Sequence, residues 1–167
     1  MQSEPTSLRV KDPGIRKLFS EESRFQSWLD VEGALAKAQG ELGVIPKGAA
    51  DEIASKAKLS NLDMDAIRKG HARTGHALVP LIWELDRVCE SGAGGYVHWG
   101  ATTQNITQTG HLLLLKRVHE IILAQISEIL RLMADLAEET QQFYMPGRTH
   151  GQHAVPTTFG LKTAVWI

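Results

Sequence analysis

Hydrogen-bond donors gather in residues 147–160, close to the end of the chain. Four of them, Arg148, Thr149, His150 and Gln152, fall within five consecutive positions. Because histidine titrates near neutral pH, His150 could act as a general acid or hydrogen-bond an anionic leaving group. A histidine in a loop can equally be structural, so its residue type leaves both interpretations open.

A second polar cluster, residues 97–109, contains His98, Thr102, Thr103 and Asn105. The threonines and the amide stand where a long helical pattern begins. Free backbone N–H groups and the helix dipole favour an anion at such a position, so a carboxylate or a phosphate could dock there. The alternative is that Thr102 or Thr103 only caps the helix.

A third cluster, residues 70–76, contributes His76. The closest histidine pairs are His71 with His76 and His150 with His153. Neither pair has the four-residue spacing of a helical zinc site, and no cysteine or paired carboxylate completes a ligand set. We therefore expect no metal. Phosphate-binding glycine loops and a serine nucleophile elbow are also missing from the sequence.

Composition excludes several other classes of function. The 18 Lys and Arg residues nearly balance the 19 Asp and Glu residues, and no block of five like charges occurs, so neither nucleic acid nor an anionic membrane is expected as a partner. The first residues lack a secretory signal, and no apolar run is long enough to span a membrane. The single Cys89 fits a reducing compartment, so we expect a cytoplasmic protein.

The segments that must position these clusters have helical patterns. Apolar residues recur at helical spacing in residues 15–42, which predicts one or two helices, and again in residues 78–88. Pro46 can begin the next helix, and Asn61 or Asp63 can cap a short one that ends near Gly70. Strand signals are nearly absent, so the predicted fold class is all-α.

Residues 103–143 contain no proline and one glycine, and they predict one very long helix. Such a helix is about 60 Å long, so it must pack in an elongated bundle with other subunits. We expect a helical domain in residues 1–100 and the first part of the bundle in 101–167. A last apolar helix is predicted from near Pro156, and its uncapped end suggests a chain cut from a larger protein. The predicted apolar stripe of the long helix is Leu114, Val118, Ile121, Ile122, Ile126, Ile129, Met133 and Leu136.

Two of the clusters carry a family resemblance. Residues 97–109 resemble the first signature of the fumarase/aspartase superfamily, and residues 148–160 resemble the second, in the same order and at the same spacing. The second signature, Arg-Thr-His-Gly-Gln followed by Pro-Thr-Thr-Phe-Gly, is most similar to the adenylosuccinate lyase branch. Residues 75–81 and 98–102 are more similar to 3-carboxy-cis,cis-muconate cycloisomerases.

The resemblance implies a helical homotetramer in which each active site collects segments from three subunits. It implies an anti elimination through a carbanion stabilised as an aci-carboxylate, with release of fumarate from a dicarboxylate substrate such as adenylosuccinate, without a cofactor. His150 and His76 would be catalytic. The substrate would be bound by His98, Thr102, Thr103, Asn105, Thr149 and Gln152.

The chain departs from the superfamily pattern at two positions. Asn105 and Gln108 stand where the first signature usually has aspartates, which removes two negative charges and puts adenylosuccinate as the substrate in doubt. The resemblance also places the catalytic serine base in a third signature beyond Ile167. We therefore expect these 167 residues to be inactive alone.

Two alternatives to an adenylosuccinate lyase remain. A 3-carboxymuconate cycloisomerase-like enzyme fits residues 98–102, although such enzymes commonly lack a histidine at the position of His150. A non-catalytic helical scaffold would explain the loss of charge at Asn105 and Gln108. The presence of the serine segment in the whole protein would argue against the scaffold.

Overall fold

A computed structural model describes residues 11–167, so the predicted lack of a secretory signal concerns residues outside this range. Internal contacts divide the chain into two compact units, the first ending at Val118 and the second spanning His119–Ile167. The boundary falls inside helix α6 (Thr103–Glu139). The domain division after residue 100 stays a prediction.

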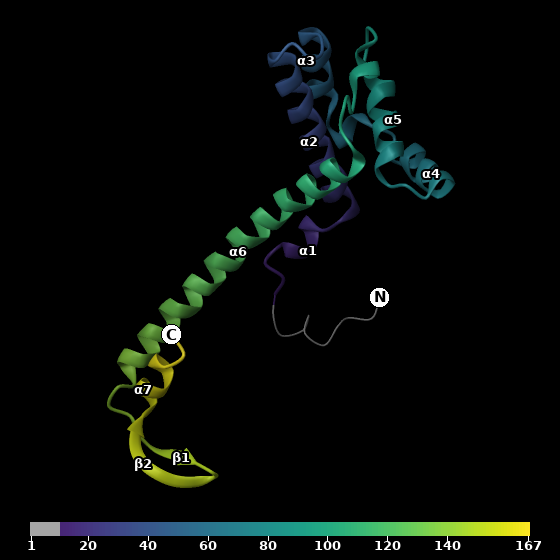
Figure 1. Ribbon diagram of the computed structural model, residues 1–167. Coiled ribbons are helices and arrows are strands. Elements are labelled where there is room, and N and C mark those ends of the chain that lie inside the picture. Colours follow the sequence, from purple (N-terminus) through teal and green to yellow (C-terminus); the bar gives the residue numbers. More distant parts are fainter. Residues whose placement is uncertain (1–10) are drawn as a thin grey trace. The chain divides into compact units, whose positions relative to one another are not determined.

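The first unit consists of helices joined by short turns (Figure 1). Helix α2 begins after Ser20, whose hydroxyl accepts a hydrogen bond from the backbone N–H of Ser23, and α4 begins after Asp63, which caps it in the same way. Pro46 precedes α3, as predicted. The helical elements before α6 are α1 (Ile15–Leu18), α2 (Glu21–Glu41), α3 (Lys47–Lys56), η2 (Leu59–Asn61), α4 (Met64–Thr74), α5 (Leu78–Val88) and η3 (Ala93–Tyr96).

Helix α4 runs four residues past its predicted end at Gly70. A Cβ on Gly70 would lie 2.7 Å from Cβ of Pro80, so this glycine permits close packing inside the helix rather than ending it. The helix ends at Gly75, whose φ of 66° gives the left-handed conformation usual after a helix. The glycine signal was therefore correct in kind but was assigned to the wrong residue.

The core of the first unit forms where α2, α3, α4, α5 and the start of α6 meet. Its apolar side chains follow the helical spacing seen in the sequence, and burial of each contributes about 1.5–3 kcal/mol. Helix α6 joins this core through Ile106, which is 2% exposed. The fully buried side chains of the other helices include Phe25, Leu29, Ile53, Ile67, Leu78, Leu81 and Leu85.

Gly110 sets how closely α6 approaches α2. A Cβ at this position would lie 2.6 Å from Cδ1 of Trp28 and 2.9 Å from Oγ of Ser27. We expect Gly110→Ala to destabilise the protein by about 1–3 kcal/mol, because the neighbours must shift to accept the methyl group. Gly48→Ala in α3 is the matched control, since nothing lies within 4 Å of its Cβ position. Thermal unfolding should show a lower Tm for Gly110→Ala only; equal Tm values would contradict the close packing.

The second unit contains the rest of α6, a β-hairpin and a short helix. Strand β1 (Tyr144–Thr149) pairs antiparallel with β2 (Gln152–Thr158), and α7 (Phe159–Ala164) follows. The N–H of Phe159 donates to the carbonyl of Phe143, and that of Gly160 donates to the carbonyl of Thr140. These bonds attach α7 to the end of α6.

The hairpin corrects the expectation that His150 lies in a loop. Most of its side chains are exposed, and Pro146 stands opposite Pro156, so the sequence shows neither apolar alternation nor a proline-free strand. Helix α7 begins at Phe159 rather than near Pro156, because the Thr158 hydroxyl caps it by accepting from the N–H of Leu161. The fold class is nevertheless all-α, with helices dominant and one small sheet in the described residues.

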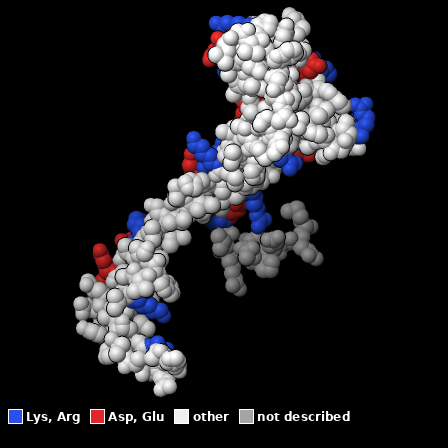
Figure 2. Space-filling view, in the orientation of Figure 1, with Lys and Arg blue, Asp and Glu red and all other residues white. Residues whose placement is uncertain are grey.

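Helix α6 confirms the prediction of one long helix, and it ends at Glu139, four residues earlier than expected. In this chain much of its apolar surface is exposed, and Figure 2 shows uncharged surface between scattered charged groups along it. No helix in residues 11–167 is both long enough and apolar enough to cross a membrane. We use the name α6 stripe for Ile122, Ile126, Ile129, Met133 and Leu136, which recur at alternating spacings of four and three residues.

Candidate active site

The predicted site residues belong to both units. The first unit holds five of them, which lie before α5, before α6 and in the first turn of α6. The second unit holds the other three, all at the hairpin. In chain order the residues are His76, His98, Thr102, Thr103 and Asn105 in the first unit, and Thr149, His150 and Gln152 in the second.

The hairpin presents His150 at its end. Thr149 pairs with Gln152, which leaves His150 and Gly151 as a two-residue turn with φ values of 49° and 72°. Two positive φ values are the pattern of a type I′ turn, and histidine tolerates this conformation better than most residues do. Thr149, His150 and Gln152 are all exposed. The turn therefore brings a hydroxyl, an imidazole and an amide together on a surface that a ligand can reach.

His98 is fixed by a contact that local sequence does not reveal. Its Nδ1 lies 2.6 Å from Oε1 of Glu32 on α2, although 66 residues separate the two in the chain. Glu32 is 1% exposed. Burial raises the pKa of the Glu32 carboxyl, and the hydrogen bond with His98 opposes that rise. The available signal was a charged residue on the apolar face of α2, in line with Trp28 and Ala36.

Thr102 and Thr103 flank the start of α6, and Asn105 lies in its first turn. The carbonyl of Thr102 accepts from the N–H of Asn105 at 3.0 Å. Within residues 11–167, however, neither threonine hydroxyl accepts a hydrogen bond from the first turn of α6. Thr102 and Asn105 are exposed. The structure therefore does not support the capping interpretation, and the role of the two hydroxyls in anion binding stays a prediction.

One ring nitrogen of His76 makes a structural hydrogen bond, and the other is left for a substrate. The ring Nδ1 of His76 accepts a hydrogen bond from the backbone N–H of Val79 at 3.3 Å. The backbone N–H of His76 donates to the Thr74 hydroxyl at 3.2 Å. With Nδ1 as an acceptor, the proton of a neutral ring sits on Nε2. The exposed side chain can therefore cap α5 and offer an N–H to a substrate at the same time.

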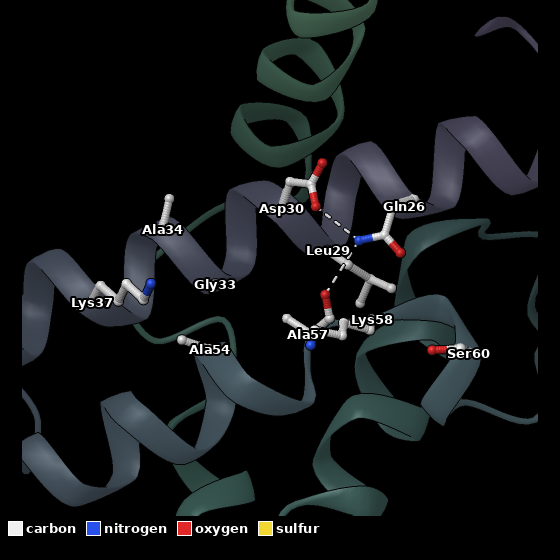
Figure 3. Close-up of a pocket in the computed structure, with 10 residues that line it drawn as sticks. All are labelled: Gln26, Leu29, Asp30, Gly33, Ala34, Lys37, Ala54, Ala57, Lys58 and Ser60. Atoms are coloured by element: carbon white, nitrogen blue, oxygen red, sulfur yellow. Dashed lines mark hydrogen bonds between the residues drawn. The ribbon is translucent and has the colours of Figure 1, made fainter.

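A groove of about 560 Å³ lies elsewhere, between α2 and the segment that contains η2 (Figure 3). No predicted site residue lines it. Its amide and carboxylate already bond within the protein: Gln26 donates to Asp30 at 2.8 Å and accepts from the N–H of Leu59 at 2.8 Å. Since this amide and this carboxylate are occupied, the groove is a weaker candidate for chemistry than the two signature segments are. In residues 11–167 no three side chains of metal-ligating type come together.

Cys89 is a poor nucleophile in this environment. Partial burial, together with Glu52 and Asp86, raises the pKa of its thiol to about 11. Because only the thiolate reacts, we expect alkylation by iodoacetamide at pH 8 to be roughly 100-fold slower than for a free thiol, and to accelerate with rising pH up to about 11. Mass spectrometry of the Cys89 peptide gives the rate. A plateau below pH 9 would contradict the raised pKa.

Curated relatives of the chain include lyases that act on succinylated compounds. It is 42% identical to the adenylosuccinate lyase of Methanocaldococcus jannaschii over 166 residues, which is 99% of this chain and 36% of the relative. It is also 42% identical to the N-acetyl-S-(2-succino)cysteine lyase of Dickeya dadantii over 155 residues, 93% of this chain and 34% of the relative. The chain thus spans about a third of the length of these relatives.

Solved structures show the same fold. A fumarate lyase from Mesorhizobium sp. BNC1 superposes with a TM-score of 0.87 at 39% identity, covering 93% of this chain and 36% of that one. A 3-carboxy-cis,cis-muconate lactonizing enzyme from Pseudomonas putida gives a TM-score of 0.86 at 31% identity, covering 98% and 38%. The cycloisomerase branch is therefore represented among the structural neighbours, and the adenylosuccinate lyase branch among the sequence relatives.

The pattern of the family described as Lyase matches residues 7–167. This match includes both signature segments, the helix between them and the buried helices of the first unit. The chain therefore belongs to this lyase family of the fumarase/aspartase superfamily.

Proposed function

We propose that the whole protein is a lyase that removes fumarate from a succinylated amine such as adenylosuccinate by anti elimination. The observation that carries the proposal is the end of the hairpin, where a two-residue turn presents His150 between Thr149 and Gln152. Similarity to an adenylosuccinate lyase over 99% of the chain supports this substrate class.

The chemistry needs one group to bind charge and another to deliver a proton. A base removes a proton from the carbon beside a carboxylate, the C–N bond breaks as the C=C bond forms, and the departing nitrogen gains a proton. In our proposal His150 supplies that proton, because an imidazole is the side chain that most often acts as a general acid. The base is expected from a serine segment outside these 167 residues.

The amino terminus of α6 suits the other role. Negative charge accumulates on the substrate carboxylate as the aci-carboxylate forms. Hydroxyl donors on Thr102 and Thr103, the Asn105 amide and the positive end of the helix dipole would stabilise this charge more in the transition state than in the ground state. His76 and His98 would complete the site from the same unit.

The exposed α6 stripe also bears on how subunits assemble. We propose a homotetramer in which the α6 stripe packs against other subunits and each active site takes segments from several of them. Four of the five stripe residues are at least 39% exposed in this chain, which is unusual for apolar side chains at coiled-coil spacing. The scattered charges in Figure 2 suit a cytoplasmic enzyme for a small molecule rather than a nucleic-acid or membrane protein. The proposal needs no cofactor.

A second candidate is a 3-carboxy-cis,cis-muconate cycloisomerase-like activity. The observation that favours it is the superposition with the enzyme from Pseudomonas putida over 98% of this chain. Cycloisomerisation also places charge on a carboxylate, so the α6 amino terminus would serve both reactions. The two activities differ in product: the cycloisomerase would form a lactone, and the lyase would form fumarate.

One panel of assays tests these proposals on the whole protein. Adenylosuccinate, argininosuccinate, carboxymuconate and N-acetyl-S-(2-succino)cysteine are incubated separately, and fumarate or lactone is measured. We expect fumarate from adenylosuccinate. Fumarate from the thioether alone would move the leaving atom from nitrogen to sulfur, and lactone would establish the second candidate. No turnover of any substrate would favour the scaffold.

A further inference from the structure

Helix α2 holds the segment before α6 at two consecutive residues. Glu32 contacts Nδ1 of His98, and Gln39 donates from Nε2 to the carbonyl of Trp99 at 2.8 Å. Glu32 and Gln39 are seven residues apart, so they lie two turns apart on one face of the helix. His98 itself has a φ of 60°, a left-handed conformation that is uncommon for a non-glycine residue, although histidine tolerates it better than most.

Glu32 is an unusual residue to find at this place. Its side chain is 1% exposed, and within residues 11–167 its second oxygen, Oε2, has no hydrogen-bond partner. An apolar side chain of similar size would avoid the desolvation of a carboxylate. A buried carboxylate whose one partner is a histidine of the first signature points to a role in setting the state of that histidine.

Glu84 shows what a structural carboxylate looks like in the same unit. It is also buried, at 8% exposed, but Arg87 binds both of its oxygens at distances between 2.7 and 3.1 Å. Oε2 of Glu84 also accepts from the N–H of Asp63. Among residues 11–167 Glu32 finds no such compensation, which separates it from a carboxylate kept only for stability.

We propose that Glu32 is a positioning residue, which keeps the proton of His98 on Nδ1 and leaves Nε2 as the nitrogen offered to the substrate. The two nitrogens of a neutral imidazole share one proton, and an anionic acceptor at one nitrogen fixes it there. Nε2 then carries the lone pair, so it can accept a hydrogen bond or a proton from the substrate. The role in turnover rests on the proposed lyase function, whereas the proton position does not.

Solid-state NMR of the whole protein tests the proton position directly. The protein is labelled with 13C and 15N in histidine only, and the His98 signals are identified by their loss in His98→Gln. Protonated and unprotonated ring nitrogens have widely different shifts, so the tautomer is read without any activity. We expect a protonated Nδ1 in the native protein. A native His98 with an unprotonated Nδ1 would overturn the proposal, even if no variant at Glu32 folds.

Two variants then link the proton position to turnover. Glu32→Gln removes the anion at almost constant shape, so His98 should change to the Nε2-protonated form, and kcat should fall by about 10- to 100-fold with a smaller change in KM. Glu84→Gln is the matched control, a buried carboxylate neutralised away from His98, and should leave both the His98 spectrum and kcat unchanged.

The outcomes separate the positioning role of Glu32 from the proposed lyase function. An unchanged His98 spectrum in Glu32→Gln would overturn the positioning role. A changed spectrum with unchanged kcat would also overturn it, because the tautomer would then have no part in the reaction. If the native protein turns over none of the four substrates, the proposed function fails, and the tautomer in native protein and Glu32→Gln still decides whether Glu32 controls His98.

Discussion

Replacement of His150 by glutamine is expected to lower kcat by about 10²- to 10⁴-fold, the usual contribution of a general acid. His150 is exposed at a turn and lies outside the core, so folding and subunit assembly should not change. Steady-state kinetics on the whole protein, together with its mass in solution, measure both effects. A kcat within a few-fold of the native value would remove His150 from the mechanism.

The left-handed conformation of His150 calls for a second variant. Glutamine is less suited than histidine to a φ of 49°, so His150→Gln combines loss of the imidazole with backbone strain. Asparagine accepts this conformation readily, and His150→Asn isolates the loss of the imidazole. His153→Gln is the matched control, because His153 lies on the same hairpin, opposite Arg148, and has no role in our proposal. Only the two His150 variants should lose turnover.

The double substitution Ile126→Glu with Ile129→Glu is expected to dissociate the assembly. The two side chains are 46% and 54% exposed in the chain, and neither belongs to the core of the first unit, so their replacement leaves that core intact. Burial in a subunit interface contributes about 1.5–3 kcal/mol for each isoleucine, and an unpaired carboxylate in its place adds a desolvation penalty. Association should therefore weaken by at least roughly 100-fold per interface. Analytical ultracentrifugation over a range of concentrations gives the subunit mass.

Ser127→Glu is the control for this experiment. Ser127 is exposed on α6 between the two isoleucines, and it lies outside the α6 stripe, so it gains a charge without losing apolar surface. It should assemble as the native protein does. An assembled double variant, or a native protein that is a stable monomer, would contradict the packing of the stripe against other subunits. Loss of turnover on dissociation would further support sites shared between subunits.

The helices could be predicted from sequence where local rules decide the structure. Residues 78–88 were predicted as a helix, and α5 has these bounds, because Pro80 is tolerated in a first turn and the apolar residues keep one face. Asp63 was one of the two predicted caps for α4, with Asn61 as the other, since capping depends only on the next three residues. Helix α6 needed no more than its apolar spacing and its lack of proline.

Contacts between residues far apart in the chain could not be predicted from local sequence patterns. The hairpin was missed because its strands are exposed on both faces and contain prolines opposite each other, so their order comes from pairing and not from burial. The contact between Glu32 and His98 joins residues 66 positions apart. The identities of the site residues came from resemblance to a superfamily, and their partition between the two units could only be seen in the structure.

The spacing of the α6 stripe has a geometrical consequence for any helix that covers it. Alternating steps of four and three residues average 3.5 per turn, slightly less than the 3.6 of a straight α-helix. The contact line therefore drifts around α6, and a partner helix keeps touching it only by winding around α6 in a left-handed sense. Knobs-into-holes packing then sets a crossing angle of about 20° and an axial separation of about 8–10 Å. The sequence of this one helix would thus dictate the handedness of the proposed bundle.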